Sequence, residues 1–364
     1  MKRYDIAIVG AGMAGASLAA AIGARASVVM IEAEEVAGYH ATGRSAAFWS
    51  ETYGGSGVQP LTTASGPFLH DGGFLEPLGS LHIGRAADVA AIEAFLAEFE
   101  GSGVTLERVD PAAHVPGLRP DWSLGVMEAS SAYIDVAALH ARYLADARRA
   151  GAELLLRAPL ASAVREGGDW VVATGEYRFR AGVLVNAAGA WADPVARIAG
   201  AAPIGVQPYR RTLVQLATDP AAPAELPHVA DISGNFYFKP EAGGRLWLSP
   251  HDETAVDPHD VQPEEIDVAI AIDRFEQVVD WRVTKLERRW AGLRSFAPDR
   301  LPVYGYDCQV PAFFWCAGQG GFGIQTAPAG AALAAALLLR TAPDASVAAI
   351  DPARYAPGRF GPLA

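Results

Sequence analysis

The 364-residue sequence predicts an α/β fold in which a Rossmann-like domain is interleaved with an α+β domain built on an antiparallel sheet. Residues 4–32 read as a strand, a glycine turn, a small-residue helix and a second strand. Residues 208–250 contain alternating runs that are typical of antiparallel strands. Residues 313–340 return to a buried strand, a glycine loop and a helix, so we expect the far end of the chain to complete the first domain.

The first glycine turn has the spacing of a dinucleotide fingerprint. Gly10 permits the tight turn, Gly12 has no Cβ to block a pyrophosphate, and Gly15 lets the helix pack closely on the strand. The helix directs its first N–H groups and its positive dipole end toward the phosphates. Glu32 follows about twenty residues later, where a carboxylate can accept hydrogen bonds from a ribose diol and would repel the 2′-phosphate of NADP. An ordinary turn is the alternative, but the flanking strands and the acid argue against it.

The segment after the second strand favours FAD over NAD. Residues 38–50, GYHATGRSAAFWS, form a polar, small-residue loop. Arg44 can pair with the pyrophosphate, and Thr42 and Ser45 offer hydroxyls. A simple NAD enzyme needs no second phosphate clamp here, although a surface loop with a solvated arginine would have the same composition.

A second glycine loop lies in residues 319–326. Gly320, Gly321 and Gly323 follow a buried strand and precede a helix, so N–H groups and a helix dipole meet at one point. Such a point can stabilise the negative charge that develops on a flavin ring during reduction. A loop of this kind can also be simple punctuation, and its combination with the N-terminal fingerprint favours the flavin interpretation.

Composition limits the class of protein. The chain is 51% hydrophobic and 19% charged, which suits a large core, and its length favours two domains. The formal net charge of −12 argues against a nucleic-acid partner or a polybasic membrane patch. The longest apolar stretch, residues 327–339, is too short for an integral membrane segment, and the N-terminus does not read as a signal peptide. Cys308 and Cys316 are too few for a disulfide framework, so we expect a cytoplasmic protein.

The two domains are expected to be discontinuous. We assign residues 1–74, 132–204 and 286–364 to the FAD-binding domain, and residues 75–131 and 205–285 to the substrate-binding domain.

Individual elements follow from local patterns. We expect one strand over residues 75–85, an amphipathic helix over residues 89–99, and another over residues 264–281. Asp135 is expected to cap a helix that ends at Gly151.

Two arginines and a tyrosine are candidates for binding a carboxylate. Arg294 lies in the apolar run WAGLRSF, where a buried guanidinium needs an anionic partner. Arg211 and Tyr237 come from expected antiparallel strands, and a guanidinium fork suits an α-carboxylate. Strand alternation lets only one of Arg210 and Arg211 face the site, and we prefer Arg211. A surface ion pair is the alternative for each arginine.

These motifs resemble the D-amino-acid oxidase (DAO) superfamily, including glycine oxidases, and most closely its D-arginine dehydrogenase branch. GAGMAG, GYHATGRSAA, LVNAAGAW, RWAGLRSF and QGGFGIQT follow the family order over nearly the whole chain. The resemblance implies an FAD-dependent oxidoreductase that oxidises a small carboxylate substrate, expected to be a D-amino acid, to the imino acid by hydride transfer to flavin. Water then gives the 2-oxo acid and ammonia, and oxygen or a quinone reoxidises the flavin. Related sarcosine oxidases attach flavin through a cysteine near RWAGLRSF, where this sequence has Gly292, so we expect non-covalent FAD.

The fingerprint and the resemblance together imply a set of site residues. The expected cofactor contacts are Gly10, Gly12, Ala14, Gly15, Glu32, Ala33, Ala41, Thr42, Gly43, Arg44, Ser45, Ala46, Ala47, Val164 (near adenine), Ala188, Gly189, Gly320, Gly321, Phe322, Gly323, Ile324 and Gln325. The expected catalytic residues are Tyr53, Arg211, Tyr237 and Arg294. None of the eight histidines has metal-ligand spacing with another ligand, so no metal is expected.

Two positions depart from the D-arginine branch. That branch carries an acid where this sequence has Ser80, and a histidine where this sequence has Phe48. Without the acid, a buried guanidinium of the substrate would be unpaired and costly, so arginine is not the expected best substrate. Glu51 and Glu76 could still supply an acid.

Other functions are open from the sequence. A flavin dehydrogenase of a 2-hydroxy acid or a secondary amine, similar to sarcosine and glycine oxidases, would use the same arginines, and ammonia release would separate it. A flavin-bearing binding module without turnover is disfavoured by two intact glycine loops and a carboxylate clamp. An NAD-linked dehydrogenase is disfavoured by the C-terminal loop.

Overall fold

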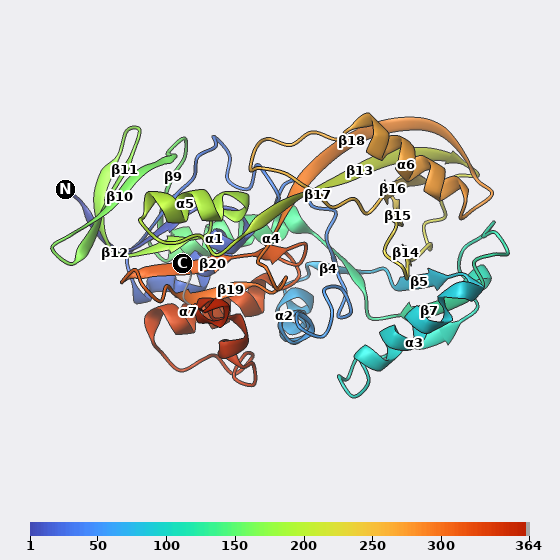
Figure 1. Cartoon of the computed structure of the whole chain (residues 1–364), viewed down its shortest axis with the longest axis horizontal. Helices are drawn as coiled ribbons and strands as arrows, with labels where there is room; N and C mark the ends of the chain where they lie inside the picture. The colour runs from blue at the N-terminus through green and yellow to red at the C-terminus, as the bar shows by residue number, and fades with distance from the viewer. Residues whose placement is uncertain (362–364) are drawn as a thin grey trace.

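The computed structural model describes residues 1–361, which form two lobes joined by long strands (Figure 1). One lobe contains an eight-stranded sheet with both ends of the described chain, and the other contains a ten-stranded sheet. A separate three-stranded sheet joins residues 48–49, 75–77 and 132–134. This mixed α/β architecture confirms the predicted fold class.

The first sheet is mainly parallel. Its parallel strands, in spatial order, are β9 (Glu153–Leu155), β2 (Val28–Ile31), β1 (Arg3–Val9), β12 (Arg178–Asn186) and β20 (Phe313–Ala317). Antiparallel additions are β10 (Leu160–Glu166) and β11 (Asp169–Thr174), next to β12, and β19 (Val303–Tyr306), next to β20. The sheet therefore combines strands from the start, middle and end of the chain, as the interleaved pattern predicted.

The second sheet is mainly antiparallel and contains the two longest strands, β13 (Gln207–Asp219) and β18 (Arg282–Phe296). They pair from Gln207 opposite Phe296 to Asp219 opposite Arg282, so the domain boundary expected at residue 286 falls inside β18. The sheet continues from β13 through β16 (Arg245–Ser249), β15 (Tyr237–Glu241), β14 (His228–Asp231), β5 (Ser80–Gly84), β7 (Leu124–Glu128) and β6 (Glu107–Val109). Short strands β21 (Gln319–Gly320) and β17 (Thr254–Ala255) add to β18 and β13.

The single strand expected over residues 75–85 is wrong. Residues 75–77 form β4 (Leu75–Pro77), which joins β8 (Ala132–Ile134) and β3 (Phe48–Trp49) in the three-stranded sheet. The chain then turns at Gly79, whose φ of +73° favours glycine, and enters the ten-stranded sheet as β5.

One helix, over residues 192–198, was not predicted from the sequence, and the other helices have bounds that differ from the predicted ones by a few residues. The helices are α1 (Met13–Ile22), α2 (Gln59–Asp71), α3 (Val89–Glu98), α4 (Val136–Arg149), α5 (Ala192–Ile198), α6 (Glu265–Glu276) and α7 (Ala327–Leu339). The Asp135 carboxylate caps α4 by accepting a hydrogen bond from the Ala138 N–H at 2.8 Å. Helix α6 ends before residue 281, and Val279 is buried beyond its end. In α3, Val89 is exposed and Ile92 is the fully buried apolar residue.

Among residues 1–361, no helix is both long and apolar enough to cross a bilayer. The same residues contain no cluster of three or more metal-ligating side chains.

Candidate active site

A cavity of about 500 Å³ lies at the carboxyl ends of β1, β2 and β12 and extends to β13 and β18 of the second lobe. Open parallel sheets bind ligands at the carboxyl ends of their strands, at the point where the strand order reverses. Its walls come from many separate stretches of the chain, including the loop of residues 38–48 and the loop of residues 319–325. The two glycine loops identified in the sequence therefore face the same cavity.

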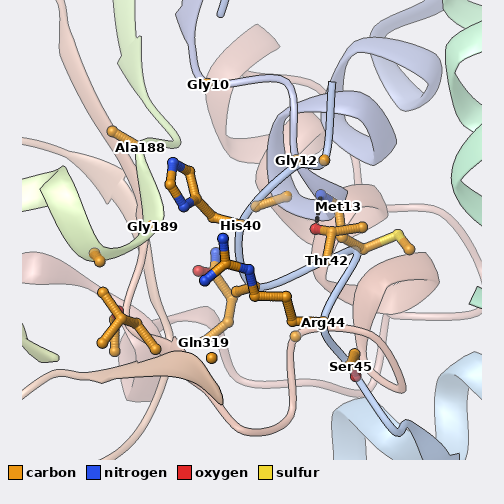
Figure 2. Close-up of a pocket in the computed structure, with 18 of the residues that line it drawn as sticks. Gly10, Gly12, Met13, His40, Thr42, Arg44, Ser45, Ala188, Gly189 and Gln319 are labelled. Carbon is orange, nitrogen blue, oxygen red and sulfur yellow. Dashed lines mark hydrogen bonds between the residues drawn. The ribbon is translucent and has the colours of Figure 1, made fainter. Parts of the chain in front are cut away.

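The glycine turn forms the nucleotide end of this cavity. Gly10 has a φ of +100°, and a Cβ on Gly15 would lie 1.9 Å from the Gly10 carbonyl oxygen, so the helix packs on the turn only because residue 15 is glycine. Gly12 caps α1, and the Thr42 hydroxyl accepts a hydrogen bond from the Met13 N–H at 2.9 Å (Figure 2). The glycine turn of residues 10–15 and the loop of residues 38–48 therefore meet at the start of α1.

Glu32 connects the turn to the end of β2. Its carboxylate accepts hydrogen bonds from the Ala11 N–H at 2.9 Å and from the Glu34 N–H at 3.1 Å. The side chain lines the cavity, where a carboxylate can also accept from ribose hydroxyls.

Arg44 lines the cavity, and its guanidinium also forms hydrogen bonds and an ion pair with residues of the second lobe. Its Nη1 donates to the carbonyls of Val261 at 3.0 Å and Ala291 at 3.3 Å, and its Nη2 pairs with Asp260. The Trp290 indole N–H donates back to the Arg44 carbonyl at 3.0 Å. The sequence prediction had this guanidinium pair with a pyrophosphate, a role that remains a prediction.

His40 belongs to the cavity, although the sequence-based set of site residues did not include it (Figure 2). Its Nε2 lies 2.9 Å from a Glu34 carboxylate oxygen, and its ring packs 4.5 Å from that of Trp191. Met13 and Gln319 also line the cavity and were missed. These three residues could have been predicted from the sequence, because each lies inside or beside one of the motifs that line the cavity.

The C-terminal loop approaches the second lobe closely. Gly320 has a φ of +56°, and a Cβ on Gly321 would lie 2.4 Å from Nε of Arg294, so only glycine brings the backbone this near. Gln325 fixes the loop, because its Nε2 donates to the Tyr53 carbonyl and to the Thr62 hydroxyl, both at 2.9 Å.

The four expected catalytic residues gather at the same end of the cavity. Arg294 donates from Nη2 to the Tyr53 hydroxyl at 2.9 Å and from Nη1 to Glu253 at 2.8 Å. Its Nε is buried and has no hydrogen-bond partner within residues 1–361. Arg211 donates from Nε to the Asp252 carbonyl at 2.9 Å, and its guanidinium lies 6.0 Å from the centre of the Tyr237 ring. A small anion can therefore be bound between these side chains.

Strand alternation separates Arg210 from Arg211. Arg211 lines the cavity, whereas Arg210 points to the other face of β13, where it pairs with Glu264 and, at 2.8 Å, with Asp267. Of the two arginines, Arg211 is therefore the one at the cavity wall, and its binding of a substrate remains a prediction.

Four expected cofactor contacts lie outside the cavity walls: Gly15, Gly43, Val164 and Phe322. Gly15 packs against the turn, and the Gly43 N–H closes the loop onto the Gly38 carbonyl at 2.7 Å. Val164 is on β10 with 54% of its surface exposed. Phe322 is buried against the Tyr53 ring, 5.1 Å away. The remaining eighteen expected contacts, from Gly10 to Gln325, line the cavity.

The side-chain end of the cavity is aromatic. Phe48, Tyr53 and Tyr237 line it, and the buried His228 ring packs 4.2 Å from Phe48. Ser80 lies behind this wall, 3.0 Å from Nδ1 of His228. Among residues 1–361, the carboxylates that line the cavity are Glu32 and Glu34, both at the nucleotide end, so Glu51 and Glu76 do not supply an acid to it.

The residues present fit an FAD molecule by their chemistry. A glycine turn at a helix start, a carboxylate after β2 and a second glycine loop line one continuous cavity. Backbone N–H groups and an arginine pair near the second loop match the end of a flavin where charge develops.

Comparison with known proteins places the chain in a family. A sequence profile of the FAD dependent oxidoreductase (DAO) family matches residues 5–337, so the chain belongs to this family. It is an FAD-dependent oxidoreductase.

Individual relatives are distant. The mitochondrial dimethylglycine dehydrogenase of Mus musculus is 28% identical over 252 residues, which are 64% of this chain and only 29% of that protein. The structure of L-proline dehydrogenase from P. horikoshii aligns with a TM-score of 0.86 at 20% identity, over 99% of this chain and 98% of that one. Glycine oxidase from Geobacillus kaustophilus aligns with a TM-score of 0.82 at 22% identity, over 96% and 99%. These structures share the fold, and their substrates differ.

Proposed function

We propose that the protein oxidises a D-amino acid to the imino acid, which water then converts to the 2-oxo acid and ammonia. FAD, when bound, supplies the hydride acceptor, and oxygen or a quinone takes the electrons from it. The specificity for a D-amino acid and non-covalent attachment of FAD are parts of this proposal.

The observation that carries the proposal is the Arg294 guanidinium, which lines the cavity beside the Tyr53 hydroxyl. A guanidinium at the wall of a cavity can bind a carboxylate through charge-assisted hydrogen bonds. The Tyr53 hydroxyl, already bonded to the same guanidinium at 2.9 Å, still has its own proton to donate to the second carboxylate oxygen. Arg211 adds a second positive charge at the same end of the cavity.

Positioning is the main contribution expected of these side chains. Holding the carboxylate at Arg294 and Arg211 fixes the α-carbon of the substrate relative to the glycine loop of residues 319–325. Burial raises the pKa of Tyr237, so this phenol stays protonated and can donate a hydrogen bond to the bound anion. Phe48, Tyr53 and Tyr237 give this part of the cavity an apolar wall, and among residues 1–361 no carboxylate lines it to pair with a cationic side chain.

A second candidate is oxidation of a secondary amine or a 2-hydroxy acid. The apolar wall formed by Phe48, Tyr53 and Tyr237 favours it, because an N-alkyl group would pack there as well as an amino-acid side chain. Glycine, proline and dimethylglycine are named in the enzymes with similar folds or sequences, which supports an amine with a carboxylate in either case.

An anaerobic panel tests both. Purified holoenzyme is mixed with D-amino acids, L-amino acids, N-methylglycine and 2-hydroxy acids, and loss of the yellow flavin absorbance is followed. We expect apolar D-amino acids to bleach the flavin and ammonia to appear in equal amount. Bleaching by 2-hydroxy acids or N-methylglycine alone would overturn the first candidate. A matched Arg294→Met variant should lose bleaching at the same substrate concentration while keeping its FAD.

A further inference from the structure

A carboxylate from the second lobe is buried against the turn that carries Tyr53. Glu128 is the last residue of β7, and none of its surface is exposed. It accepts hydrogen bonds from the Ser50 hydroxyl at 2.8 Å, the Glu51 N–H at 2.6 Å and the Thr52 hydroxyl at 2.6 Å. One side chain therefore binds three consecutive residues directly before Tyr53.

The opposite side of this turn is held by the C-terminal loop. Gln325 accepts a hydrogen bond from the Ser50 N–H at 3.3 Å and donates to the Tyr53 carbonyl at 2.9 Å. The Tyr53 ring packs 5.2 Å from Phe48 and 5.1 Å from Phe322. With both ends of the turn fixed, the phenol has little freedom to leave the position from which it contacts Arg294.

Burying a carboxylate at this position costs desolvation free energy. Burial raises the pKa of Glu128, while its hydroxyl and N–H partners favour the ionised form. Its partners are neutral donors, so its cost is offset only by the hydrogen bonds of the turn. An apolar residue could fill the space without that cost, but it would leave the N–H of Glu51 and two hydroxyls without this acceptor.

We propose that Glu128 is a positioning residue for Tyr53 and, through Tyr53, for the carboxylate clamp. The kinetic consequence rests on the proposed function; the effect on Tyr53 itself does not. The second lobe thereby fixes a substrate-binding side chain that is carried by the first lobe. Glu128 holds the turn through the hydroxyls of Ser50 and Thr52, and the Tyr53 hydroxyl at the end of this turn accepts the hydrogen bond from Arg294.

A double-mutant cycle in the holoenzyme tests the kinetic part. With a D-amino acid, Glu128→Gln is expected to lower kcat/KM about tenfold in the wild-type background and by less than about threefold in a Tyr53→Phe background, because both changes remove the same interaction. The matched control is Asp307→Asn, since the Asp307 carboxylate also accepts three N–H bonds, from Gln309, Val310 and Trp315, away from the cavity. If the effects of Glu128→Gln and Tyr53→Phe multiply, Glu128 does not act through Tyr53.

A second measurement needs no substrate. The holoenzyme is labelled with 3-fluorotyrosine, and the Tyr53 signal in the ¹⁹F NMR spectrum is assigned with Tyr53→Phe. Glu128→Gln and the milder Thr52→Val are each expected to shift or broaden this signal, and Asp307→Asn is expected to leave it unchanged. An unchanged Tyr53 signal in both variants would overturn the proposal. If no D-amino acid reduces the wild-type flavin, the proposed function fails, and the NMR result still decides the role of Glu128.

Discussion

The Tyr53 hydroxyl accepts a hydrogen bond from Nη2 of Arg294 at 2.9 Å, across 241 residues of sequence. Arg294 is held at its other end by Glu253, whose carboxylate lies 2.8 Å from Nη1. The guanidinium is thus fixed at both terminal nitrogens, and the Gly321 backbone covers its Nε, since a Cβ on Gly321 would come within 2.4 Å of that atom. Loops and strands of both lobes are needed to bring these side chains together.

Arg294→Lys should weaken substrate binding although the charge is kept. An ammonium cannot bond Tyr53, Glu253 and a carboxylate in the geometry of the guanidinium fork. We expect the Kd of a small carboxylate inhibitor to rise about a hundredfold, since charge-assisted hydrogen bonds contribute about 1.5–3 kcal/mol. Titration followed by the flavin spectrum measures this Kd. Arg282→Lys, at the exposed start of the same strand, is the control and should change nothing.

Gly15→Ala should prevent FAD binding. The new methyl group would lie 1.9 Å from a backbone oxygen of Gly10, and no rotation of a side chain can relieve that overlap. We expect a loss of stability of about 3 kcal/mol or more and a protein purified without its yellow colour. Gly175→Ala, where no tertiary neighbour among residues 1–361 lies within 4 Å of the added carbon, is the control. A yellow Gly15→Ala variant with an unchanged melting temperature would contradict the close packing of α1 on the turn.

The parts of the fold that were predictable from sequence are those set by local interactions. The glycine turn needs Gly10 and Gly15 within a few residues of each other, and the Asp135 cap needs only Ala138. The break between β4 and β5 was missed, although Leu78 interrupts the alternation of apolar residues directly before Gly79. What separates the two strands is the choice of partner, β8 for one and β7 for the other, and both partners come from distant sequence.

Site residues could likewise be proposed from the sequence only where a local feature marked them. Arg294 was proposed because a buried guanidinium in an apolar strand needs an anionic partner, and Arg211 because strand alternation lets only one of Arg210 and Arg211 face the site. The lobe-bridging bonds of Arg44 could not, since its acceptors at Val261 and Ala291 are carbonyls more than two hundred residues away. Glu128 was missed because no motif marks a carboxylate whose partners are hydroxyls of a distant turn.

Stability should fall as the pH is lowered from about 6.5 toward 4, in part because of His82. Burial lowers the pKa of this imidazole from 6.5 to about 4, and its Nε2 has no hydrogen-bond partner in the described chain. Between these two values the unfolded chain binds the proton and the folded chain does not. The free energy of unfolding therefore decreases as pH falls, by up to about 1.4 kcal/mol per pH unit for one group.

Thermal melts at pH 7, 6, 5 and 4.5 check this dependence. His82→Phe, which keeps a ring against Phe95, should flatten the fall in melting temperature relative to wild type. The exposed His114→Gln variant is the control and should follow wild type. Parallel curves for His82→Phe and wild type would show that His82 does not contribute to the acid sensitivity.

The neighbouring arginines of β13 should fail in different ways when each is replaced by methionine. Arg210 is the partner of Asp267 at 2.8 Å and of Glu264, so Arg210→Met leaves a buried carboxylate without its cation and should cost about 3–5 kcal/mol of stability. Arg211→Met should cost far less, because Asp252 keeps its bonds to Thr212 at 2.7 and 3.0 Å.

Chemical denaturation and carboxylate binding, measured on both variants, separate the two roles. Arg210→Met is expected to lower the denaturation midpoint while the protein that remains folded binds a small carboxylate normally. Arg211→Met is expected to keep most of its stability and to bind that carboxylate at least about tenfold more weakly, since it loses a charge-assisted bond. The reverse pattern would mean that Arg210, rather than Arg211, faces the bound anion, and that the side-chain alternation along β13 is shifted by one residue from the register in which Arg211 lies opposite Gly292.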